Sequence, residues 1–532
     1  MTLFSSQNLA MAQWAVAATL LGLMAACVPL ALMVVRREVA GWGRRSVWTL
    51  AGAVLVGAVL RLLAPKLIAT VFIGYRATAE AIRLFPVPHY GIGTATFYNL
   101  VFSFLPADHL TLMWTNTVIG ILTLPLLAVL AGRLLREPRA ALVFAWIVAL
   151  LPLLVRNDTS DANNVPVLLW LCTGLLLWLD GLDGSRWSAV AAMPALMLVA
   201  ISRPEQPLFL TVLLPLVTVM HGVHRAPWRD PVIVVAALLG AALLVPHVLH
   251  VLQSIDLLRS RGSLPGPLLM MPSWEPHRHA VLHPLLYPPP LLVLALVPLI
   301  LPSPIGRLRV LALIAIALFA HVVTLSDCDW ANAARVGVPE ALFVTMLASL
   351  GAVRVVDRVR AGRLVAAGLI GALVAGTAAR TAIQLWQPTN ERTEEALVEE
   401  ATALLPGGPL TLLKPGAKER DERFTHLFFP DYRLGPEQHS MAITEFLERP
   451  DWRVPVYAFL GLRCYARFRP WGLPAPEGTQ ERRSCAELRA SMRLEPLFER
   501  TVPNHGDVWI PYYGTAPELL VGFYRVYPDG EP

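Results

Sequence analysis

The sequence predicts a polytopic α-helical membrane protein with a C-terminal α/β domain. Of its 532 residues, 55% are hydrophobic and only 15% are charged, and its mean hydropathy is +0.55. Soluble domains carry about 25% charged residues, so this deficit, together with repeated apolar runs, indicates a membrane protein. The third observation is a change to charge-rich sequence at Trp386, where the apolar runs end.

About twelve apolar segments approach the ~20 residues that a helix needs to cross a bilayer. We expect spans at 13–35, 46–64, 112–132, 140–155, 164–180, 187–202, 207–220, 231–250, 289–302, 310–325, 340–353 and 364–385. The first segment is longer than the apolar core of an export signal, and no Lys or Arg precedes it. It is therefore expected to be retained, as part of an extra N-terminal region at 1–45 ahead of a membrane domain at 46–385.

The distribution of Lys and Arg predicts the orientation of these helices. Sixteen lie in the short loops 36–45, 133–139, 180–186, 221–230, 303–309 and 353–363, against three in 1–12, 156–163, 203–206 and 326–339. Positive charge collects on the cytoplasmic side of a membrane, so the first set of loops is expected to face the cytoplasm. The N-terminus, the long loops 65–111 and 251–288 and everything after residue 385 then lie outside. This pattern is a topology signal, and no nucleic-acid partner is expected.

Residues 386–532 are expected to form an extracytoplasmic α/β domain, because about 145 residues suffice for independent folding. The segment "NERTEEALVEEATALL" has the periodicity of a helix, and "LTLLKP", "VPVYAFLGL" and "LLVGFYRVY" are typical of strands. Cys464 and Cys485 lie in this exported part and are the best disulfide candidates. The alternative is two free thiols.

Polar residues gather in five clusters on the predicted outer face. They are the first long loop, "RNDTSDANN" at 156–164, "SRPEQP" at 202–207, "EPHRHAVLH" in the loop 251–288, and "SDCDWANAARVGVPE" at 326–340. Charged groups near membrane depth persist where they line a wet cavity or a site. The clusters therefore predict a cavity that opens outward and accepts a polar head group. No Walker A loop or Rossmann fingerprint accompanies them.

The order of these features resembles the GT-C superfamily of integral-membrane glycosyltransferases. The stretch "HYGIGTATFYNLVFSF" followed by "LTLMWTNTVIGILTLPLLAVLAGRLL" is similar to the exit of that family's first outer loop and its next helix. "LLPLLVRNDTSDANNVPVLLWL", "AISRPEQPLFL" and "ANAARVGVPEALF" resemble its second outer turn, its Arg-Pro hairpin and its late outer loop. The resemblance covers roughly 46–385. The first loop departs from the family pattern, because it has no Asp before Asp108 and Glu80 is its only early acid.

The resemblance implies a transferase of the mannosyltransferase or aminoarabinose-transferase kind, in the cytoplasmic (inner) membrane. Its donor would be a sugar linked to a polyprenyl phosphate, which enters from the membrane lipids. Its acceptor would be a lipid-linked glycan, a lipid or an exported protein on the outer face. Two other functions stay open: a non-catalytic relative that binds a lipid-linked saccharide, and a transporter or flippase. A transporter should show internal repeats, which are not evident here.

In the glycosyltransferase interpretation, a carboxylate deprotonates the acceptor hydroxyl and the donor phosphate leaves. Glu80 is the candidate base, on the helical stretch "ATAEAIRLF". The alternative is a solvated helix face that pairs Glu80 with Arg76 or Arg83. His89 and Tyr90 are candidates to position the acceptor, or they are polar residues of a turn.

The second and third clusters supply further candidates for substrate binding. Asp158 and Asp161 are three residues apart and could share one helical face, where they would bind sugar hydroxyls or a divalent ion. Their other interpretation is N-capping of the apolar run that starts at Val165. Arg203 could hold the lipid phosphate or could extend to the interface.

The fifth cluster holds the strongest phosphate candidate, Arg335, because a guanidinium matches phosphate geometry. Asp327 and Asp329 could neutralise Arg335 or ligate a divalent metal ion. A zinc site at the three histidines of "EPHRHAVLH" has no supporting partner motif. Beyond this optional metal ion, the sequence predicts no cofactor.

Overall fold

The protein, seen in a computed structural model, divides into two compact units, with a boundary along the chain between Trp386 and Gln387. The structure describes residues 6–66, 92–106, 109–160, 162, 164–202, 206–221, 230–260, 289–301, 305–325, 338–359, 362–386, 390–415, 434–435, 437–467, 478–505 and 514–528. We refer to the part that ends at Trp386 as the helical unit and to the part that follows as the C-terminal unit.

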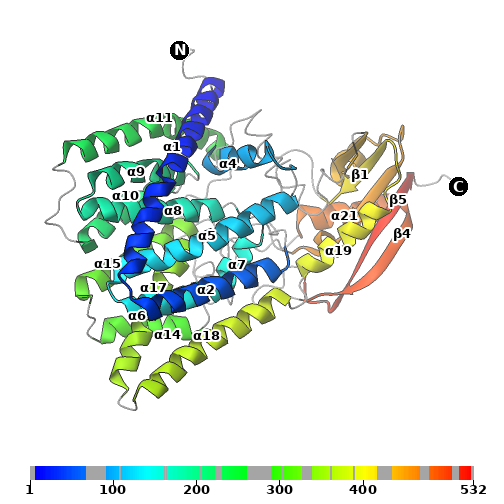
Figure 1. Cartoon of the computed structure of the whole chain (residues 1–532). Helices are drawn as coiled ribbons and strands as arrows, with labels where there is room; N and C mark the ends of the chain where they lie inside the picture. The colour runs from blue at the N-terminus through cyan, green and yellow to red at the C-terminus, as the bar shows by residue number, and fades with distance from the viewer. Residues whose placement is uncertain are drawn as a thin grey trace. The chain divides into compact units, whose positions relative to one another are not determined.

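The described part of the helical unit is made of α-helices (Figure 1). In chain order they are α1 (Ser6–Ala40), α2 (Arg44–Leu63), α4 (Ile92–Phe102), α5 (His109–Leu135), α6 (Pro138–Leu150), α7 (Pro152–Asp158), α8 (Asn164–Leu182), α9 (Arg186–Ala200), α10 (Gln206–His221), α11 (Pro231–Ser260), α14 (Pro289–Ile300), α15 (Arg307–Leu325), α17 (Val338–Arg358) and α18 (Gly362–Trp386). Each of the twelve apolar segments that the sequence predicts as spans falls on one of these helices, or, for 140–155, on the pair α6 and α7.

Six described helices are long and apolar enough to cross a membrane: those within α1, α2, α5, α8, α11 and α17. The predicted span 140–155 is not one straight helix, because α6 and α7 meet at Leu151 with a bend of 54°. Counted as one broken span, the pair makes a seventh. The fold class is therefore that of a polytopic membrane protein, and the count of twelve spans stays a prediction.

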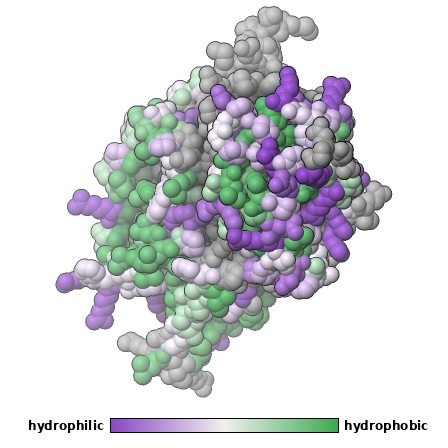
Figure 2. All heavy atoms as spheres, turned by 90° about the vertical axis from the view of Figure 1, so that its right-hand side faces the viewer, coloured by the Kyte–Doolittle hydropathy of each residue, from purple (hydrophilic) through white to green (hydrophobic). Residues whose placement is uncertain are grey.

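The helical unit buries a large apolar core with smaller apolar clusters beside it, and it also exposes large apolar side chains. Leu32 of α1, Trp48 and Leu63 of α2 and Leu238 of α11 are each more than half exposed. Such side chains face lipid without cost, because lipid tails are as apolar as they are. Figure 2 shows one face of the molecule, on which green hydrophobic areas and purple hydrophilic areas are both visible.

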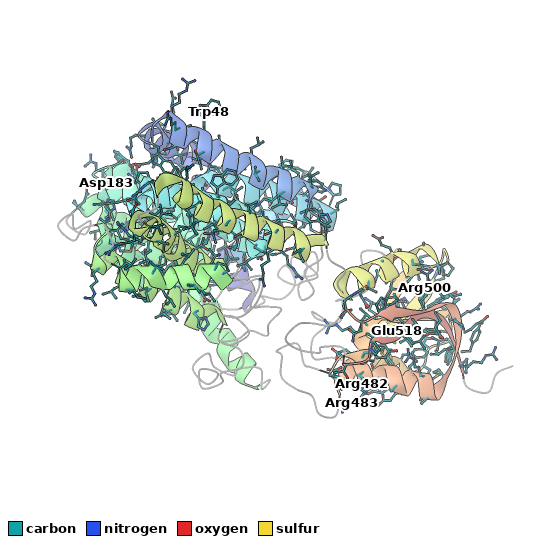
Figure 3. The ribbon with its side chains drawn as sticks, turned by 90° about the horizontal axis from the view of Figure 1, so that it is seen from below. Trp48, Asp183, Arg482, Arg483, Arg500 and Glu518 are labelled. Carbon is teal, nitrogen blue, oxygen red and sulfur yellow. A yellow bond between two sulfur atoms is a disulfide. The ribbon has the colours of Figure 1, made fainter. Side chains whose placement is uncertain are left out.

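Charged side chains from the predicted cytoplasmic loops meet at one end of the helical unit, which we call the inner end. Arg133 of α5 donates to Glu38 of α1 at 2.9 Å and to Asp183 at 2.9 Å, and His221 of α10 lies 2.8 Å from Asp183. Trp48 and Asp183 lie toward the same end of the unit in Figure 3. Loops that are far apart in the sequence are thus joined at one end, as the charge pattern requires.

The C-terminal unit is an α/β sandwich built on a five-stranded sheet of order β2-β1-β3-β5-β4. Its elements are α19 (Asn390–Ala403), β1 (Leu410–Lys414), β2 (Gln438–Ala442), α20 (Ile443–Glu448), β3 (Val456–Leu460), the 3-10 helix η4 (Leu462–Tyr465), α21 (Gln480–Ser491), β4 (Met492–Pro503) and β5 (Glu518–Pro528). The strands β2, β1 and β3 are parallel, and β5 and β4 complete the sheet in antiparallel pairing.

Each face of this sheet carries its own apolar layer. Leu397 and Val398 of α19 pack on one face with Phe459 and Phe523, and α20 and α21 cover the other. The helix and three strands predicted from the sequence are all present, whereas β2, β4, α20 and α21 were not predicted. Cys464 of η4 and Cys485 of α21, the pair that the sequence suggests, are joined by a disulfide with a Cα–Cα distance of 5.5 Å.

Candidate functional site

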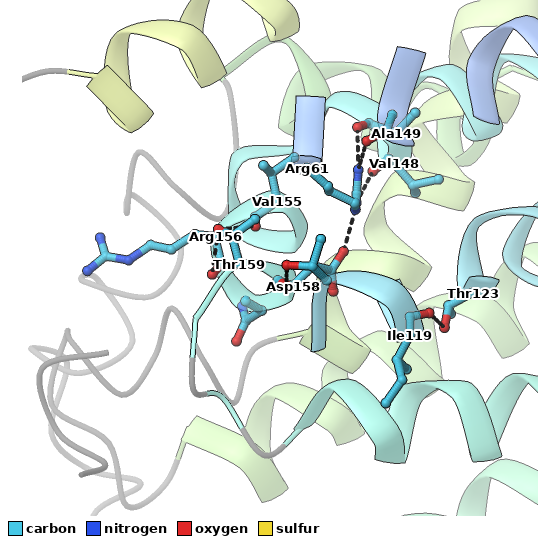
Figure 4. A network of polar contacts seen from close by, with 12 residues as sticks. Arg61, Ile119, Thr123, Val148, Ala149, Val155, Arg156, Asp158 and Thr159 are labelled. Carbon is cyan, nitrogen blue, oxygen red and sulfur yellow. Dashed lines mark hydrogen bonds and ion pairs between the residues drawn. The ribbon is translucent and has the colours of Figure 1, made fainter. Parts of the chain in front are cut away.

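The break between α6 and α7 follows from Pro152, which has no N–H to donate to the carbonyl of Val148. Arg61, in the last turn of α2, supplies donors in its place. Its guanidinium donates to the carbonyl oxygen of Ala149 at 2.8 Å and to that of Val148 at 3.5 Å (Figure 4). Thr381 of α18 donates to the next carbonyl, that of Leu150. The carbonyl groups at the C-terminal end of α6 have no partner within the helix. They therefore accept hydrogen bonds from side chains of two other helices.

The same guanidinium forms a buried ion pair with Asp158, the last residue of α7. Arg61 Nε lies 2.6 Å from Asp158 Oδ2, and the two side chains are 1% and 5% exposed. Gly120 of α5 makes room for this carboxylate, because a Cβ at that position would lie 2.3 Å from Asp158 Cγ. A buried carboxylate at membrane depth is thus compensated by one specific cation.

One interpretation of Asp158 from the sequence is wrong. Asp158 does not cap α8, because α8 begins at Asn164 and the Asp158 carboxylate bonds Arg61 instead. The helix α7 ends at Asp158, and Asp161, with which Asp158 was predicted to share a helical face, lies outside the described residues. The apolar context predicted a helix N-terminus here, but the partner that decides the geometry lies 97 residues earlier in the chain.

Side chains of α5 donate hydrogen bonds to the turn between α7 and α8. Asn116 donates from Nδ2 to the carbonyls of Ser160 at 2.9 Å and Ala162 at 3.0 Å, and Thr117 donates to the carbonyl of Asp158 at 3.0 Å. Tyr98 of α4 donates its hydroxyl proton to Asn116 Oδ1 at 2.5 Å. All of these polar side chains are buried, so α4, α5 and the turn form one satisfied network.

The other end of α4 contacts the turn between α9 and α10. The amide of Gly93 donates to the carbonyl of Ile201 at 3.2 Å. A Cβ at Gly93 would lie 2.7 Å from Ser202 Oγ, so only glycine permits this approach. The helix α4 therefore brings together the exit of the first predicted outer loop and described parts of the second and third polar clusters. We call this end of the helical unit the outer end.

A second, partly buried pair of ionisable residues was missed by sequence reasoning. His321 of α15 and Glu340 of α17 lie with Nδ1 and Oε2 3.0 Å apart, and their side chains are 15% and 7% exposed. Glu340 was noted only as the end of the fifth polar cluster. The signal that could have found the pair is a histidine inside an apolar run, since ionisable residues in spans are commonly functional.

Helix packing places this pair at the outer end as well. At the inner end, Arg309 of α15 donates to the carbonyl of Met220 on α10 at 2.8 Å, so these packed helices run in opposite directions. His321 is twelve residues further along α15, about 18 Å toward the outer end at the rise of an α-helix. The start of α10, which follows the Ser202 turn, lies at that level.

Most of the residues that the sequence selects lie outside the part of the chain that the structure describes. Those outside the described ranges are Glu80, His89, Tyr90, Asp161, Arg203, Asp327, Asp329 and Arg335. Within the described ranges, no group of three His, Cys, Asp or Glu side chains is arranged to hold a metal ion. The described part of the site thus consists of the α4 network, the Arg61–Asp158 pair and the His321–Glu340 pair.

The fold is similar to that of a solved structure, in agreement with the resemblance in sequence order. The chain is similar to the crystal structure of ArnT from Cupriavidus metallidurans bound to undecaprenyl phosphate. The TM-score is 0.51 at 11% identity, and the match covers 90% of this chain and 97% of that one.

Weaker matches connect the chain to two structures from Archaeoglobus fulgidus. Its oligosaccharyltransferase in the apo form gives a TM-score of 0.45 at 13% identity, over 79% of this chain and 70% of that one. The oligosaccharyltransferase AglB in complex with an inhibitory peptide and a dolichol-phosphate gives 0.42 at 14%, over 73% and 64%. Neither a family model nor a curated protein matches the sequence.

Proposed function

We propose that the protein is a membrane glycosyltransferase that takes a sugar from a polyprenyl-phosphate donor on the outer face of the cytoplasmic membrane. The observation that carries the proposal is the set of contacts made by α4. These contacts hold described parts of three polar outer clusters together at one end of a GT-C-like helical unit. The undecaprenyl phosphate bound to the structurally similar ArnT supports the choice of lipid. The acceptor would be a lipid-linked glycan, a lipid or an exported protein.

The proposed reaction is a displacement at the anomeric carbon. An acceptor hydroxyl loses its proton and attacks this carbon, and the bond from the carbon to the phosphate oxygen breaks. The electron pair leaves with the polyprenyl phosphate, so configuration inverts. Two protein functions are needed: a proton acceptor for the hydroxyl and positive charge near the departing phosphate.

The described residues include one cation suited to the second role. Lys66 follows α2 and donates to the carbonyl oxygen of Arg61 at 2.7 Å, with its ammonium 4.3 Å from the centre of the Trp114 ring. Among the described residues no carboxylate forms an ion pair with Lys66, whose ammonium donates to backbone carbonyls. Arg203, Arg335 and a divalent ion at Asp327 and Asp329 remain proposals for the same role.

Asp158 is assigned a supporting role in this scheme. Its carboxylate forms an ion pair with Arg61. This pair stabilises the turn between α7 and α8, which also accepts hydrogen bonds from the α4 network. For the proton acceptor the candidate is Glu80, which the sequence predicts in the first outer loop. His89, Tyr90 and Asp161 remain proposed contacts for the acceptor or the sugar.

Sugar transfer in reconstituted membranes tests the proposal. The full-length protein would be placed in liposomes with undecaprenyl-phosphate-linked radiolabelled hexoses and pentoses, one donor at a time, and washed cell membranes as the acceptor source. We expect transfer with at least one donor, dependent on the protein and abolished by excess unlabelled donor. Absence of transfer with every donor, in liposomes where donor binding is measurable, would favour a non-catalytic binding protein.

A further inference from the structure

The arginines at the inner end of the helical unit differ in how their charge is balanced. Arg133 and Arg139 bind carboxylates, the second with Nη1 at 2.8 Å from Asp357. Arg136 and Arg309 donate to backbone carbonyls instead. Within the described part of the chain, neither of these two forms an ion pair with a carboxylate, so their positive charge is not balanced by a side chain there.

The two guanidinium groups converge on one place, the C-terminal end of α10. Nη2 of Arg136 donates to the carbonyl oxygen of His221 at 3.1 Å, and Nε of Arg309 donates to that of Met220 at 2.8 Å. Because these carbonyls belong to adjacent residues, two positive charges from distant parts of the chain lie close together. Burial and the charge of Arg136 lower the pKa of Arg309, which precedes the predicted span at 310–325.

Capping of α10 accounts for only part of this positive charge. A helix C-terminus carries roughly half a negative charge, whereas the two guanidinium groups carry two positive charges. Asp183, which bonds the ring of His221, also binds Arg133. Each guanidinium has five N–H donors and directs one of them at α10. The remaining donors and the excess positive charge suit an anionic ligand.

The backbone at Arg136 gives an independent indication that its side chain has a role. Arg136 has a φ of 48°, and it is the one non-glycine residue with positive φ in the described ranges. Its amide donates to the carbonyl of Gly132 at 2.9 Å and so ends α5. Glycine is usual at this position, because it adopts the left-handed conformation without steric cost. An arginine held in this conformation indicates that the guanidinium contributes something that glycine cannot.

The surroundings of the two arginines are those of a membrane interface. Leu308 and Leu311, on either side of Arg309 in the sequence, are 60% and 49% exposed. An acyl chain can pack on such leucines while the phosphate of its headgroup accepts hydrogen bonds from guanidinium groups. A free phosphate would gain nothing from the leucines, so a phospholipid fits this place better.

We propose that Arg136 and Arg309 together bind the phosphate of an anionic phospholipid in the membrane leaflet at the inner end. The N–H groups that do not contact α10 donate to the phosphate oxygens, and the excess positive charge favours a headgroup with net negative charge. The site lies at the end opposite to the α4 network and does not depend on sugar transfer. It gives the protein a lipid partner that is distinct from a polyprenyl-phosphate donor.

Lipid binding to the full-length protein in detergent tests the proposal. Native mass spectrometry measures binding of added phosphatidylglycerol, with zwitterionic phosphatidylcholine as the comparison lipid. We expect Arg136→Gly and Arg309→Gln each to weaken phosphatidylglycerol binding by about tenfold, the effect of one charge-assisted hydrogen bond, and to change phosphatidylcholine binding little. Arg136→Gly should also fold well, because glycine adopts a positive φ readily, and thermal unfolding checks this.

Arg139→Gln is the matched control, because it removes one positive charge three residues further along at the same end. Its guanidinium is bound by Asp357, so this variant should keep the wild-type affinity for phosphatidylglycerol. Equal weakening in Arg136→Gly, Arg309→Gln and Arg139→Gln would show a general attraction to positive charge and overturn the proposal. Unchanged binding in Arg136→Gly and Arg309→Gln would overturn it as well.

A photoreactive phosphatidylglycerol with a diazirine near its headgroup locates the site in liposomes. Cross-links mapped by mass spectrometry should fall in the turn between α5 and α6 and in the first turn of α15, and they should be lost in Arg136→Gly. Inorganic phosphate at millimolar concentration should leave them intact. Loss of the cross-links with inorganic phosphate would assign the two arginines to a soluble phosphate and overturn the lipid assignment. Cross-links confined to other helices would overturn the site.

Discussion

Arg61 and Asp158 form a buried ion pair across 2.6 Å between α2 and the end of α7. Removing one member of such a pair strands a buried charge, which typically costs about 3–5 kcal/mol. Asp158→Asn is therefore expected to destabilise the helical unit by about that amount, because the guanidinium stays buried without its counter-charge. Thermal unfolding of the detergent-solubilised protein, followed by tryptophan fluorescence, measures the change.

A comparison of single and double variants separates the loss of this ion pair from a general disruption of the helical unit. The double variant Arg61→Met with Asp158→Leu should be less destabilised than the sum of the single variants, because it leaves no buried charge. Glu400→Gln is the matched control, since its bond to Arg500 is exposed and such pairs contribute about 1 kcal/mol or less. Additive single effects would show that the pair is not coupled.

The bond from Tyr98 to Asn116 predicts a kinetic effect in the proposed reaction. Tyr98→Phe removes the 2.5 Å hydrogen bond that joins α4 to the support of the Asp158 turn, and it leaves a buried amide oxygen unsatisfied. Such a loss costs about 1–3 kcal/mol. We expect a lower kcat for sugar transfer at an unchanged unfolding midpoint of the C-terminal unit.

Tyr465→Phe provides the comparison for this prediction. In the C-terminal unit the Tyr465 hydroxyl donates to the carbonyl of Leu520 at 2.5 Å and accepts from the amide of Leu520 at 3.0 Å, so Tyr465→Phe removes tyrosine hydrogen bonds away from the α4 network. Transfer should be unaffected by Tyr465→Phe. Equal losses in both variants would mean that the Tyr98 bond contributes only to stability.

Much of the fold was predictable because the hydrophobicity of a segment depends only on the residues of that segment. Each apolar segment that predicts a span lies on helix, since about twenty consecutive apolar residues determine this by themselves. The break at Leu151 was missed although Pro152 is visible, because a proline ends one helix and also starts the next. The strands β2 and β4 were missed because "QHSMA" lacks alternation of apolar and polar residues and "MRLEPLFERTVP" keeps it only over its first four residues.

The site was less predictable because its partners are distant in the chain. Asp158 was selected from its sequence neighbours, but the residue that determines its role is Arg61 on another helix. His321 escaped attention because a single histidine in an apolar run has no local partner, and Glu340 comes close only when α15 and α17 pack. Sequence order indicated which loops share a face, and only the fold showed that α4 joins them.

A buried carboxylate in the C-terminal unit predicts a pH dependence of stability. Glu394 of α19 accepts a bond from the amide of Leu462 at 2.8 Å, and its other oxygen has no hydrogen-bond partner among the described residues. Burial raises the pKa of Glu394 to about 7. The folded state then holds this proton up to about pH 7, whereas the unfolded chain releases it near its ordinary pKa of 4.5. Stability should therefore fall as pH rises from about 4.5 to 7 and stay level above that.

Hydrogen exchange of peptides from α19 and β3, corrected for intrinsic rates, measures this dependence in the full-length protein. Glu394→Gln should remove the fall, because an amide stays neutral at every pH. Glu487→Gln on the exposed surface of α21 is the control and should keep the wild-type profile. A profile for Glu394→Gln that matches the wild type would assign the pH dependence to another group.

The disulfide between Cys464 and Cys485 tests the predicted export of the C-terminal unit. A bridge that closes 21 residues stabilises a domain by about 3 kcal/mol in the chain-entropy model. Such bonds persist in oxidising compartments and are rare in the cytoplasm. Free thiols are blocked with a thiol reagent at the moment the cells are lysed. We expect both cysteines to be oxidised in the cell, so that maleimide-polymer labelling adds mass at these positions only after reduction.

The accompanying stability change makes the topology test quantitative. The variant Cys464→Ser with Cys485→Ser should unfold at a lower temperature by an amount equal to that caused by reducing the wild type, and reduction should have no further effect on it. Cys172 is buried in α8 and serves as the control, because Cys172→Ala should leave the response to reduction unchanged. Free thiols at both positions in blocked cells would place the C-terminal unit in the cytoplasm, reverse the predicted orientation, and move the outer end to the cytoplasmic face.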